Sequence, residues 1–281
     1  MVNTLLLTLS IVGYLVATVL IAKNISSQTA ETTENSSNGT AINSVFIIAI
    51  ISVLAHLFYS IGMDKIGSSI NFSLSSMTCL VSLVMTLIFL MGSLTMPIRT
   101  LGILDFPLTA ISLVFSYLWG AGVSNINPMI GSQGTAFTIH IFVSILSYCF
   151  ITIAAIQALL YVYQEQLIKK RTASTMLLAL PPLQTMELLL FRLVTIGFCL
   201  LTLTLFSGVL FSQEIFGQAF KLSHHSLLAV LSWLVLGFLL FKRYKTGLRG
   251  SQAVKWTIAG FLLMQLGYFG TKIVTESLNI Q

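Results

Sequence analysis

Residues 137–163 read FTIHIFVSILSYCFITIAAIQALLYVY and contain no Asp, Glu, Lys or Arg. A helix that crosses the hydrocarbon core of a membrane needs roughly 20 mostly apolar residues, and this stretch is long enough. Lipid offers no water to the backbone polar groups, so a spanning segment must satisfy them within its own helix. The stretch therefore predicts a transmembrane α-helix.

Seven further stretches have the same apolar character. Together, the eight candidate spans are residues 4–22, 45–63, 73–94, 104–120, 137–163, 188–211, 225–241 and 254–275. Asp105 and Pro107 interrupt the start of the fourth, and the first has no charge ahead of its apolar core, which favours a retained helix over a signal peptide. We therefore expect an all-α polytopic membrane protein, a bundle of about eight transmembrane helices, with residues 1–281 in a single integral membrane domain.

The composition of the whole chain agrees with this interpretation. Of its 281 residues, 56% are hydrophobic and only 8% are charged, and the mean hydropathy is +0.95. A soluble globular domain has about 25% charged residues, so a cytosolic enzyme, a nucleic-acid binder and a disordered scaffold are excluded. The net charge of +6 is interpreted as a sign of membrane topology, and no nucleic-acid partner is expected.

Motifs for catalysis or covalent attachment do not occur in the sequence. Cys79, Cys149 and Cys199 each lie inside an apolar run, where a thiol most simply acts as a small apolar filler. No CxxC or CxxCH motif occurs, which argues against a disulfide scaffold and a covalently attached heme. No P-loop, GxSxG or HExxH motif occurs either, so we expect no enzymatic activity.

Basic residues in short loops indicate which ends of the helices face the cytoplasm. With eight spans, eleven basic side chains fall on one side of the membrane and three on the other. The eleven are Lys23, Arg99, Lys169, Lys170, Arg171, Arg192, Lys242, Arg243, Lys245, Arg249 and Lys255, and the three are Lys65, Lys221 and Lys272. The richer side is interpreted as cytoplasmic, which places both termini on the outer side and makes residues 23–44 a flexible polar cytoplasmic loop. On the cytoplasmic side, Glu187 and Arg192 are expected to form an interfacial anchor pair.

The four histidines are candidate functional residues because ionisable groups in a membrane are costly. They are His56 in the second span, His140 near the outer start of the fifth, and His224 and His225 at the outer start of the seventh. In the topology above, all four fall in the outer half of the membrane or at its surface. Neutral imidazole binds iron, and heme is commonly held by axial histidines. The alternative is that these histidines form hydrogen bonds between helices or lie at the headgroups.

Serines extend the histidine positions into polar stripes at helical spacing. The stripes are Ser52, His56, Ser60 and Met63 on the second span, His140, Ser144 and Ser147 on the fifth, and His225 and Ser232 on the seventh. Three helices with polar faces at one level suggest a shared cavity rather than contact with lipid.

Four stretches of the second half of the chain resemble a known family. They are HIFVSILSY (140–148), LPPLQTMELLLFR (180–192) followed by Gly197-Phe198, the segment from Gly208 through Glu214, Phe216, Gly217 and Phe220 to Trp233, and GYFG (267–270). Through these stretches, residues 138–274 resemble the cytochrome c assembly family of heme-handling membrane proteins, which includes the CcsA, CcmC, CcmF, HemX and YpjD types.

The resemblance implies a heme site on the outer surface, made of axial histidines and a Trp-rich loop, with His140 at the position of the first outer ligand. The chain departs from that pattern at several positions. In the loop, the family's Trp positions are occupied by Phe211, Phe216 and Phe220. The family's Trp-Asp pair is replaced by Leu222 and Ser223, and the Pro-Lys pair that follows it is replaced by His224 and His225. A membrane histidine of the family is replaced by Phe241. No histidine follows the last span. The outer clamp is thus incomplete, which argues against ligation of cytochrome c by this chain alone and favours the HemX and YpjD-type branch.

We therefore expect a heme-binding and heme-handling protein of the bacterial inner membrane that takes part in cytochrome c assembly, with both termini on the periplasmic side. Its cofactor would be a non-covalent b-type heme, with no other metal. The candidate ligands are His56, His140, His224 and His225; the resemblance favours His224, whereas the helical face favours His225. Expected partners are membrane lipid, heme, and other proteins of cytochrome c maturation or heme biosynthesis.

Two other functions are compatible with the sequence. One is a HemX-like regulator or scaffold for heme biosynthesis that acts through the basic loops around residues 169–171 and 242–249. The other is the permease subunit of a transporter. A proton-coupled carrier usually has a carboxylate buried in the membrane. We expect no buried carboxylate here, because Asp105 is close to the inner edge of its span and the other acids lie in loops or at helix ends, and this argues against a carrier.

Overall fold

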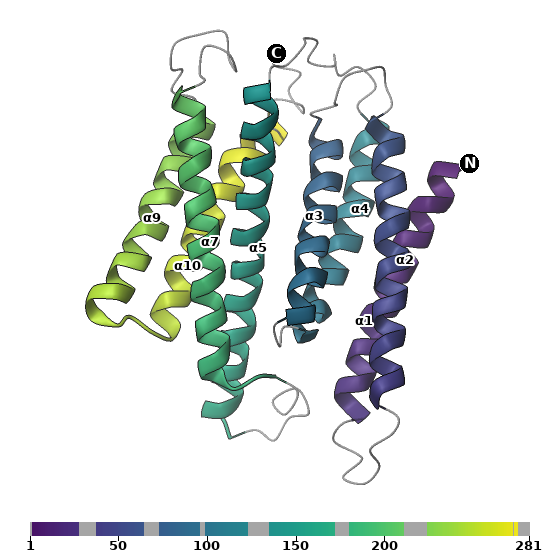
Figure 1. Ribbon diagram of the computed structural model, residues 1–281, viewed down its shortest axis with the longest axis horizontal. Coiled ribbons are helices and arrows are strands. Elements are labelled where there is room, and N and C mark those ends of the chain that lie inside the picture. Colours follow the sequence, from purple (N-terminus) through teal and green to yellow (C-terminus); the bar gives the residue numbers. More distant parts are fainter. Residues whose placement is uncertain are drawn as a thin grey trace. The chain divides into compact units, whose positions relative to one another are not determined.

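The computed structural model describes residues 2–27, 38–64, 73–95, 99–122, 135–171, 180–210, 224–271 and 273–274. Every regular element within these residues is helical, which confirms the all-α prediction (Figure 1). The elements are α1 (Val2–Ser27), α2 (Asn38–Asp64), α3 (Leu74–Thr95), η1 (Arg99–Leu101), α4 (Gly102–Gly122), α5 (Thr135–Lys169), α7 (Leu183–Leu210), α9 (His224–Thr246), α10 (Ser251–Gln265) and η2 (Leu266–Gly270).

Seven helices among the described residues are long and apolar enough to cross a membrane, and they coincide with the first seven predicted spans. The eighth predicted span, residues 254–275, has a different form. It begins as the 15-residue helix α10 and continues into a π-helical turn, η2. The protein is thus a multi-span membrane protein whose last apolar segment changes its helical winding partway along.

Contacts divide the chain into two compact units. Unit 1 comprises Met1–Pro128 and Tyr163–Leu183, and unit 2 comprises Met129–Val162 and Gln184–Gln281. Each unit is described by itself below. The organisation of the whole chain as a single integral domain stays a prediction.

Unit 1 is built from four helices that pack in a ring, α1 on α2, α2 on α3, α3 on α4 and α4 on α1. The polar stripe predicted for α2 faces the inside of this ring, since Ser52, His56 and Ser60 are all buried. The side chain of Met63 lies outside the described residues. Burial of the stripe agrees with the rule that polar side chains in a membrane avoid lipid.

The burial of Asp105 contradicts the expectation that no carboxylate is buried in this protein. Asp105 lies in the first turn of α4, yet its exposed fraction is only 2%. Neither carboxylate oxygen has a hydrogen-bond partner among the described residues. The next residue, Phe106, explains the burial. Its ring centroid lies 5.8 Å from that of Tyr14 and 5.4 Å from that of Phe89, and this packing draws the first turn of α4 in between the helices of unit 1. Unit 1 therefore contains a buried carboxyl group.

Unit 2 is held together by side chains that bond the backbone of a neighbouring helix. The hydroxyl of Ser147 in α5 donates to the Gly197 carbonyl oxygen in α7 at 3.1 Å. The hydroxyl of Ser232 in α9 donates to the Gly260 carbonyl oxygen in α10 at 2.8 Å. Ser147 and Ser232 therefore join helices within unit 2, as polar side chains commonly do in membranes, whereas the Ser144 hydroxyl donates to the His140 carbonyl oxygen of its own helix.

Glu187 forms a different ion pair from the one predicted. Its carboxylate accepts a hydrogen bond from Arg243 Nη1 at 2.9 Å and lies 3.9 Å from Arg249 Nε, whereas Arg192 is exposed. The Arg243 guanidinium also donates to the Leu248 carbonyl oxygen at 3.1 Å. Burial of Glu187 in the first turns of α7 turns its side chain toward the end of α9 rather than along its own helix, so the pair ties α7 to the α9–α10 connection.

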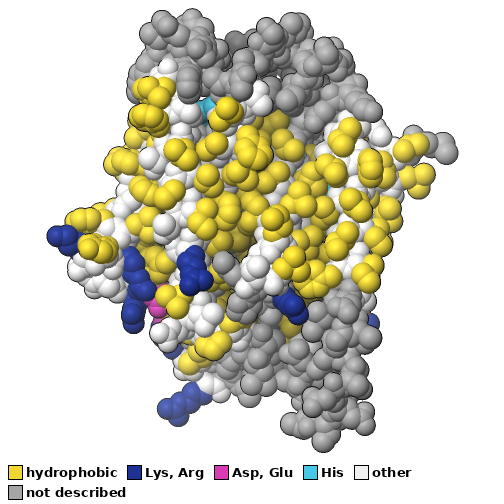
Figure 2. Space-filling model, viewed as in Figure 1, with side chains coloured by type: hydrophobic (Ala, Val, Ile, Leu, Met, Phe, Trp, Pro, Cys, Tyr) yellow, Lys and Arg dark blue, Asp and Glu magenta, His cyan; other side chains and the backbone are white. Residues whose placement is uncertain are grey.

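The surface of unit 2 has the character of a membrane protein. Figure 2 shows mostly hydrophobic side chains along the middle of α7 and α9, with Lys and Arg side chains gathered toward one end of these helices and a histidine visible toward the other. The bonded pairs agree with this division, because Glu187 and Arg243 meet at one end, and His140 and Ser207 meet at the other. Among the described residues of unit 2, the basic side chains are therefore segregated from the histidines.

The close approach of α9 and α10 generates a first prediction. A Cβ atom on Gly260 would lie 2.6 Å from Leu236 Cδ2 and 2.7 Å from its Cγ, and Leu236 is fully buried. A Cβ atom on Gly270 would lie 3.8 Å from its nearest neighbour. We expect Gly260→Ala to be about 1–3 kcal/mol less stable than the matched Gly270→Ala, because overpacking forces the helices apart. Thermal unfolding midpoints in mild detergent measure this difference, and equal midpoints would show that α9 and α10 do not approach this closely.

The Glu187 ion pair generates a second prediction. Glu187→Gln leaves the part-buried Arg243 without its counter-charge, and we expect a loss of about 1–3 kcal/mol of stability. Glu165→Gln is the matched control, since Glu165 pairs with the exposed Lys169 at a similar 2.8 Å and should lose less than about 0.5 kcal/mol. The same unfolding midpoints measure both variants. Losses of equal size would contradict a special role for Glu187.

Candidate functional site

His140 lies near the start of α5 and contacts the end of α7. Its Nδ1 is 2.8 Å from Ser207 Oγ. The single hydroxyl proton of Ser207 is donated to the Thr204 carbonyl oxygen at 3.0 Å, so Ser207 Oγ accepts from Nδ1–H of a neutral His140. This hydrogen bond selects the tautomer that leaves the Nε2 lone pair of His140 available. Among the described residues, Nε2 has no hydrogen-bond partner.

Two glycines make room for the histidine rings of unit 2. A Cβ atom on Gly208 would lie 3.3 Å from Cε1 of His140, and one on Gly267 would lie 3.5 Å from Nδ1 of His225. Each ring is therefore in contact with bare backbone of a neighbouring helix. A Cβ atom at Gly208 would press against the His140 imidazole, whereas one at Gly267 would make an ordinary van der Waals contact with that of His225.

His225 lies in the first turn of α9, at the same end of unit 2 as His140. Ring contacts connect it to α5: Tyr268 packs against Tyr148 of that helix, with ring centroids 6.2 Å apart. The His225 ring also packs edge-on against Tyr268, with ring centroids 5.9 Å apart. The structure therefore brings to the same end of unit 2 histidines from two helices that are 85 positions apart in the sequence (225 minus 140).

The π-helical turn η2 contributes aromatic walls to this end of unit 2. Tyr268 and Phe269 project from it, with ring centroids 6.2 Å and 5.6 Å from that of Tyr148 in α5. The Tyr148 hydroxyl donates to Gln265 Oε1, which ties α5 to α10 just before the turn. A π-helical turn often marks a functional site because its extra residue redirects side chains. Here it directs Tyr268 toward His225.

His56 has a different environment, inside unit 1. It is fully buried, with Nδ1 at 3.2 Å from the Tyr14 hydroxyl and Nε2 at 3.4 Å from Cys79 Sγ. Both ring nitrogens thus have partners, and binding a metal would require one of them to be released. Cys79 is consequently more than an apolar filler, whereas Cys149 is buried as expected and Cys199 is exposed on α7.

The remaining predicted site residues are not brought into this cluster. His224 and His225 are both exposed on the first turn of α9, and of the two it is His225 that packs against Tyr268. Several predicted features lie outside the described residues: Phe211, Phe216, Phe220, Leu222, Ser223, residues 275–281 and residues 28–37 of the predicted cytoplasmic loop.

Sequence reasoning missed the residues that support the histidines. Gly208, Gly267 and Tyr268 belong to stretches that carried the family resemblance, so their positions were available but their roles were not. Ser207 is 67 residues from His140, and no local pattern connects the two. Only the packing of α5 on α7 identifies Ser207 as the partner of His140.

Comparisons with known proteins agree with the resemblance. The profile of the family described as Cytochrome C assembly protein matches residues 15–279, which extends well before the stretch of 138–274. The chain is 33% identical to the inner membrane protein YpjD of Escherichia coli K12 over 142 residues, covering 50% of this chain and 52% of YpjD. It is 26% identical to the protein HemX of Brevibacillus brevis over 131 residues, covering 47% and 48% of the two chains.

A third relative is the cytochrome c biogenesis protein CcsA of Chlamydomonas reinhardtii, which is 24% identical over 147 residues, covering 52% of this chain and 40% of CcsA. The chain spans about half the length of the curated relatives it matches. The family profile, by contrast, covers nearly all of the chain, including both units. The chain therefore belongs to the cytochrome c assembly protein family.

Proposed function

We propose that this protein binds a b-type heme non-covalently at the histidine end of unit 2 and handles it for cytochrome c assembly. One observation carries the proposal: His140 and His225 lie at the same end of unit 2, and Ser207 holds His140 in the tautomer that presents Nε2. An iron-ligating histidine usually donates its other ring N–H to a nearby acceptor, which orients the ring and makes it more basic. The Ser207 hydroxyl occupies that acceptor position.

The residues at this end of unit 2 fit a planar apolar cofactor. Imidazole is a common axial ligand of heme iron, and Gly208 and Gly267 leave space beside the two rings. Tyr268 and Phe269 add apolar surface against which a porphyrin can stack. His140 is the primary ligand in this proposal and His225 the second, while His56 acts as a hydrogen-bonding residue within unit 1.

The proposed action of this chain is binding and orientation without catalysis of its own. Bound heme supplies the iron and porphyrin, and the protein holds them at a membrane surface. The relatives named for cytochrome c biogenesis support partners from cytochrome c maturation. Partners from heme biosynthesis belong to the proposal as what the resemblance to the HemX type implies. The chemistry of joining heme to a cytochrome would then belong to a partner protein.

We place the protein in the bacterial inner membrane, in keeping with the name of its relative YpjD. In this orientation the basic end of unit 2 faces the cytoplasm, as the distribution of Lys and Arg favours. The histidine end and both termini face the periplasm. Heme would thus be presented on the side where cytochromes of the c type are assembled.

The heme proposal predicts a specific loss of cofactor. Protein purified in mild detergent from heme-replete cells should show a Soret band, and His140→Ala should lower the heme content per protein about tenfold or more. His224→Ala, an exposed neighbour of His225, should retain the wild-type heme content. The pyridine hemochrome assay measures heme, and amino-acid analysis measures protein.

A further variant separates ligation from structural support. His56→Ala should lower the thermal unfolding midpoint, because it leaves Tyr14 and Cys79 without their partner, while the absorption spectrum of the folded fraction stays that of the wild type. The absence of a Soret band from wild-type protein, even after addition of hemin, would overturn the proposal. A Soret band unchanged in His140→Ala would overturn the assignment of that ligand.

The buried carboxyl group of Asp105 favours a second candidate function, a proton-coupled permease subunit. An intramembrane carboxyl is a functional candidate by default, and Asp105 is 2% exposed with no hydrogen-bond partner among the described residues. This observation removes the sequence argument against a carrier. The heme site and Asp105 belong to different units, so one substitution distinguishes the two functions.

For Asp105→Asn we expect an unchanged heme content, because His140 and its supporting residues all belong to unit 2. We also expect vesicles containing either wild type or the variant to take up protons at the same rate under an imposed membrane potential. A pH-sensitive dye trapped in the vesicles measures this rate. Proton uptake by the wild type that is lost in Asp105→Asn would favour the permease instead.

A further inference from the structure

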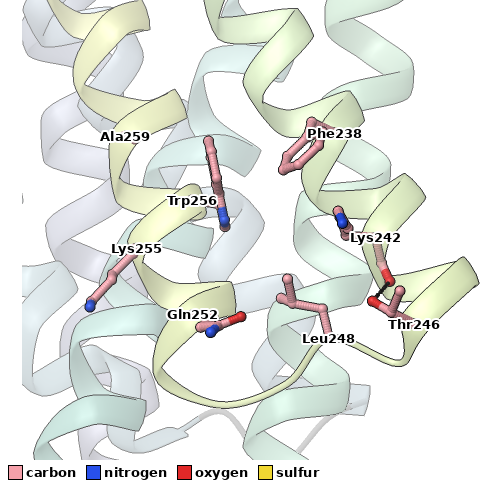
Figure 3. A pocket seen from close by; sticks show the side chains of 8 residues that line it. All are labelled: Phe238, Lys242, Thr246, Leu248, Gln252, Lys255, Trp256 and Ala259. Carbon is pink, nitrogen blue, oxygen red and sulfur yellow. Dashed lines mark hydrogen bonds between the residues drawn. The ribbon is translucent and has the colours of Figure 1, made fainter.

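A groove of about 740 Å³ lies within unit 2, at the end opposite to the histidines. It is formed by the last turns of α9, the connection between α9 and α10, and the first turns of α10 (Figure 3). None of its lining residues belongs to the proposed heme site. The groove therefore needs an explanation of its own.

The upper part of the groove is apolar. The rings of Phe238 in α9 and Trp256 in α10 lie opposite each other with centroids 4.9 Å apart, and Ala259 completes this part. Trp256 is 37% exposed, so its ring can be reached from outside. Such a surface is suited to a hydrocarbon chain.

The other end of the groove is rich in hydrogen-bond donors and lacks acidic side chains. Lys242 from α9 and Lys255 and Gln252 from α10 line it. Figure 3 shows the Lys255 ammonium group directed away from Lys242, so its flexible stem must turn for the ammonium to reach the groove. Figure 3 shows the indole nitrogen of Trp256 directed toward the same end as Gln252. Among the described residues, neither lysine ammonium group nor the indole N–H has a hydrogen-bond acceptor. The carboxylate of Glu187 is already paired with Arg243.

The position of the groove along α9 matches the headgroup level of a membrane. Lys242 is close to the end of this spanning helix, and His225 is close to its beginning. Trp and Lys are typical of the membrane–water interface, where an apolar ring or stem lies in the membrane and the polar group reaches the headgroups. The Lys242 ammonium lies 5.6 Å from the centroid of the Phe238 ring, in keeping with this arrangement.

We propose that this groove binds one anionic phospholipid. Its phosphate is held by the ammonium group of Lys242 and the indole N–H of Trp256, the Lys255 side chain swings round to the same phosphate, and one acyl chain lies along Phe238 and Ala259. Charge complementarity selects the occupant, because the groove contains two cationic side chains and no acidic one. Basic pockets between spanning helices bind anionic headgroups in this way. A zwitterionic lipid brings its own cation and so gains less from the two lysines.

The test uses the full-length protein in phosphatidylcholine vesicles that contain phosphatidylglycerol or phosphatidylcholine with brominated acyl chains. Bromine quenches tryptophan fluorescence on contact, and the contribution of Trp256 is the difference between wild type and Trp256→Phe. We expect brominated phosphatidylglycerol to quench Trp256 at a clearly lower mole fraction than brominated phosphatidylcholine. Lys242→Gln combined with Lys255→Gln should raise the mole fraction for half-quenching by about fivefold per lysine, on the order of 25-fold for both.

The matched control is Lys170→Gln combined with Lys245→Gln, which removes the same net charge from exposed positions outside the groove. It should leave the preference for phosphatidylglycerol within about twofold of the wild type, a difference of only a few tenths of a kcal/mol. The proposal is overturned if the two lipids quench the wild type equally, or if the control variant loses as much preference as the groove variant. Should the double variant fail to fold, the two single variants carry the test, each with its fivefold effect.

Discussion

Polar groups inside a membrane have no water to bond, and most features of this structure follow from that constraint. Most hydroxyl side chains satisfy it locally by bonding the carbonyl oxygen one turn earlier in their own helix, as Thr195 does to Phe191 at 2.7 Å. A few bond a different helix instead, among them Ser147, Ser232 and Ser116, which donates to the Ser75 carbonyl oxygen at 2.7 Å. These few hold the helices of each unit together, because breaking them would leave a donor without a partner in lipid.

The same constraint separates the histidines by role. His56 is fully buried, and both its ring nitrogens are used by Tyr14 and Cys79, which is how a structural histidine is accommodated in a membrane. His140 lies at the end of its helix, where only one nitrogen is used and the other is left available. A histidine with one ring nitrogen paired and the other open is the kind that binds a cofactor. The distinction rests on hydrogen-bond partners rather than on depth alone.

Much of the fold could be predicted because hydropathy is a sum over a local stretch of about 20 residues. Seven spans were predicted close to their observed positions, although the helix bounds differ. Helix α5 continues to Lys169 and contains 35 residues. At 1.5 Å per residue it is about 50 Å long, which is more than the hydrocarbon core of a membrane requires. The last span contains a π-helical turn that its apolar composition does not reveal. The partner of Glu187 and the burial of Asp105 were predicted incorrectly, since both depend on residues far away in the sequence.

The candidate site was predicted only as a set of histidines without contacts. By itself, the sequence determined that the protein is all-α, that it crosses the membrane repeatedly, and that it resembles the cytochrome c assembly family, since composition and short motifs are local properties of the chain. The tertiary structure alone decided that His140 is oriented by Ser207, that His225 packs against Tyr268, and that His56 is committed to Tyr14 and Cys79. These contacts join residues that are 23 to 67 positions apart, and the way the helices pack, which no local pattern encodes, brings them together.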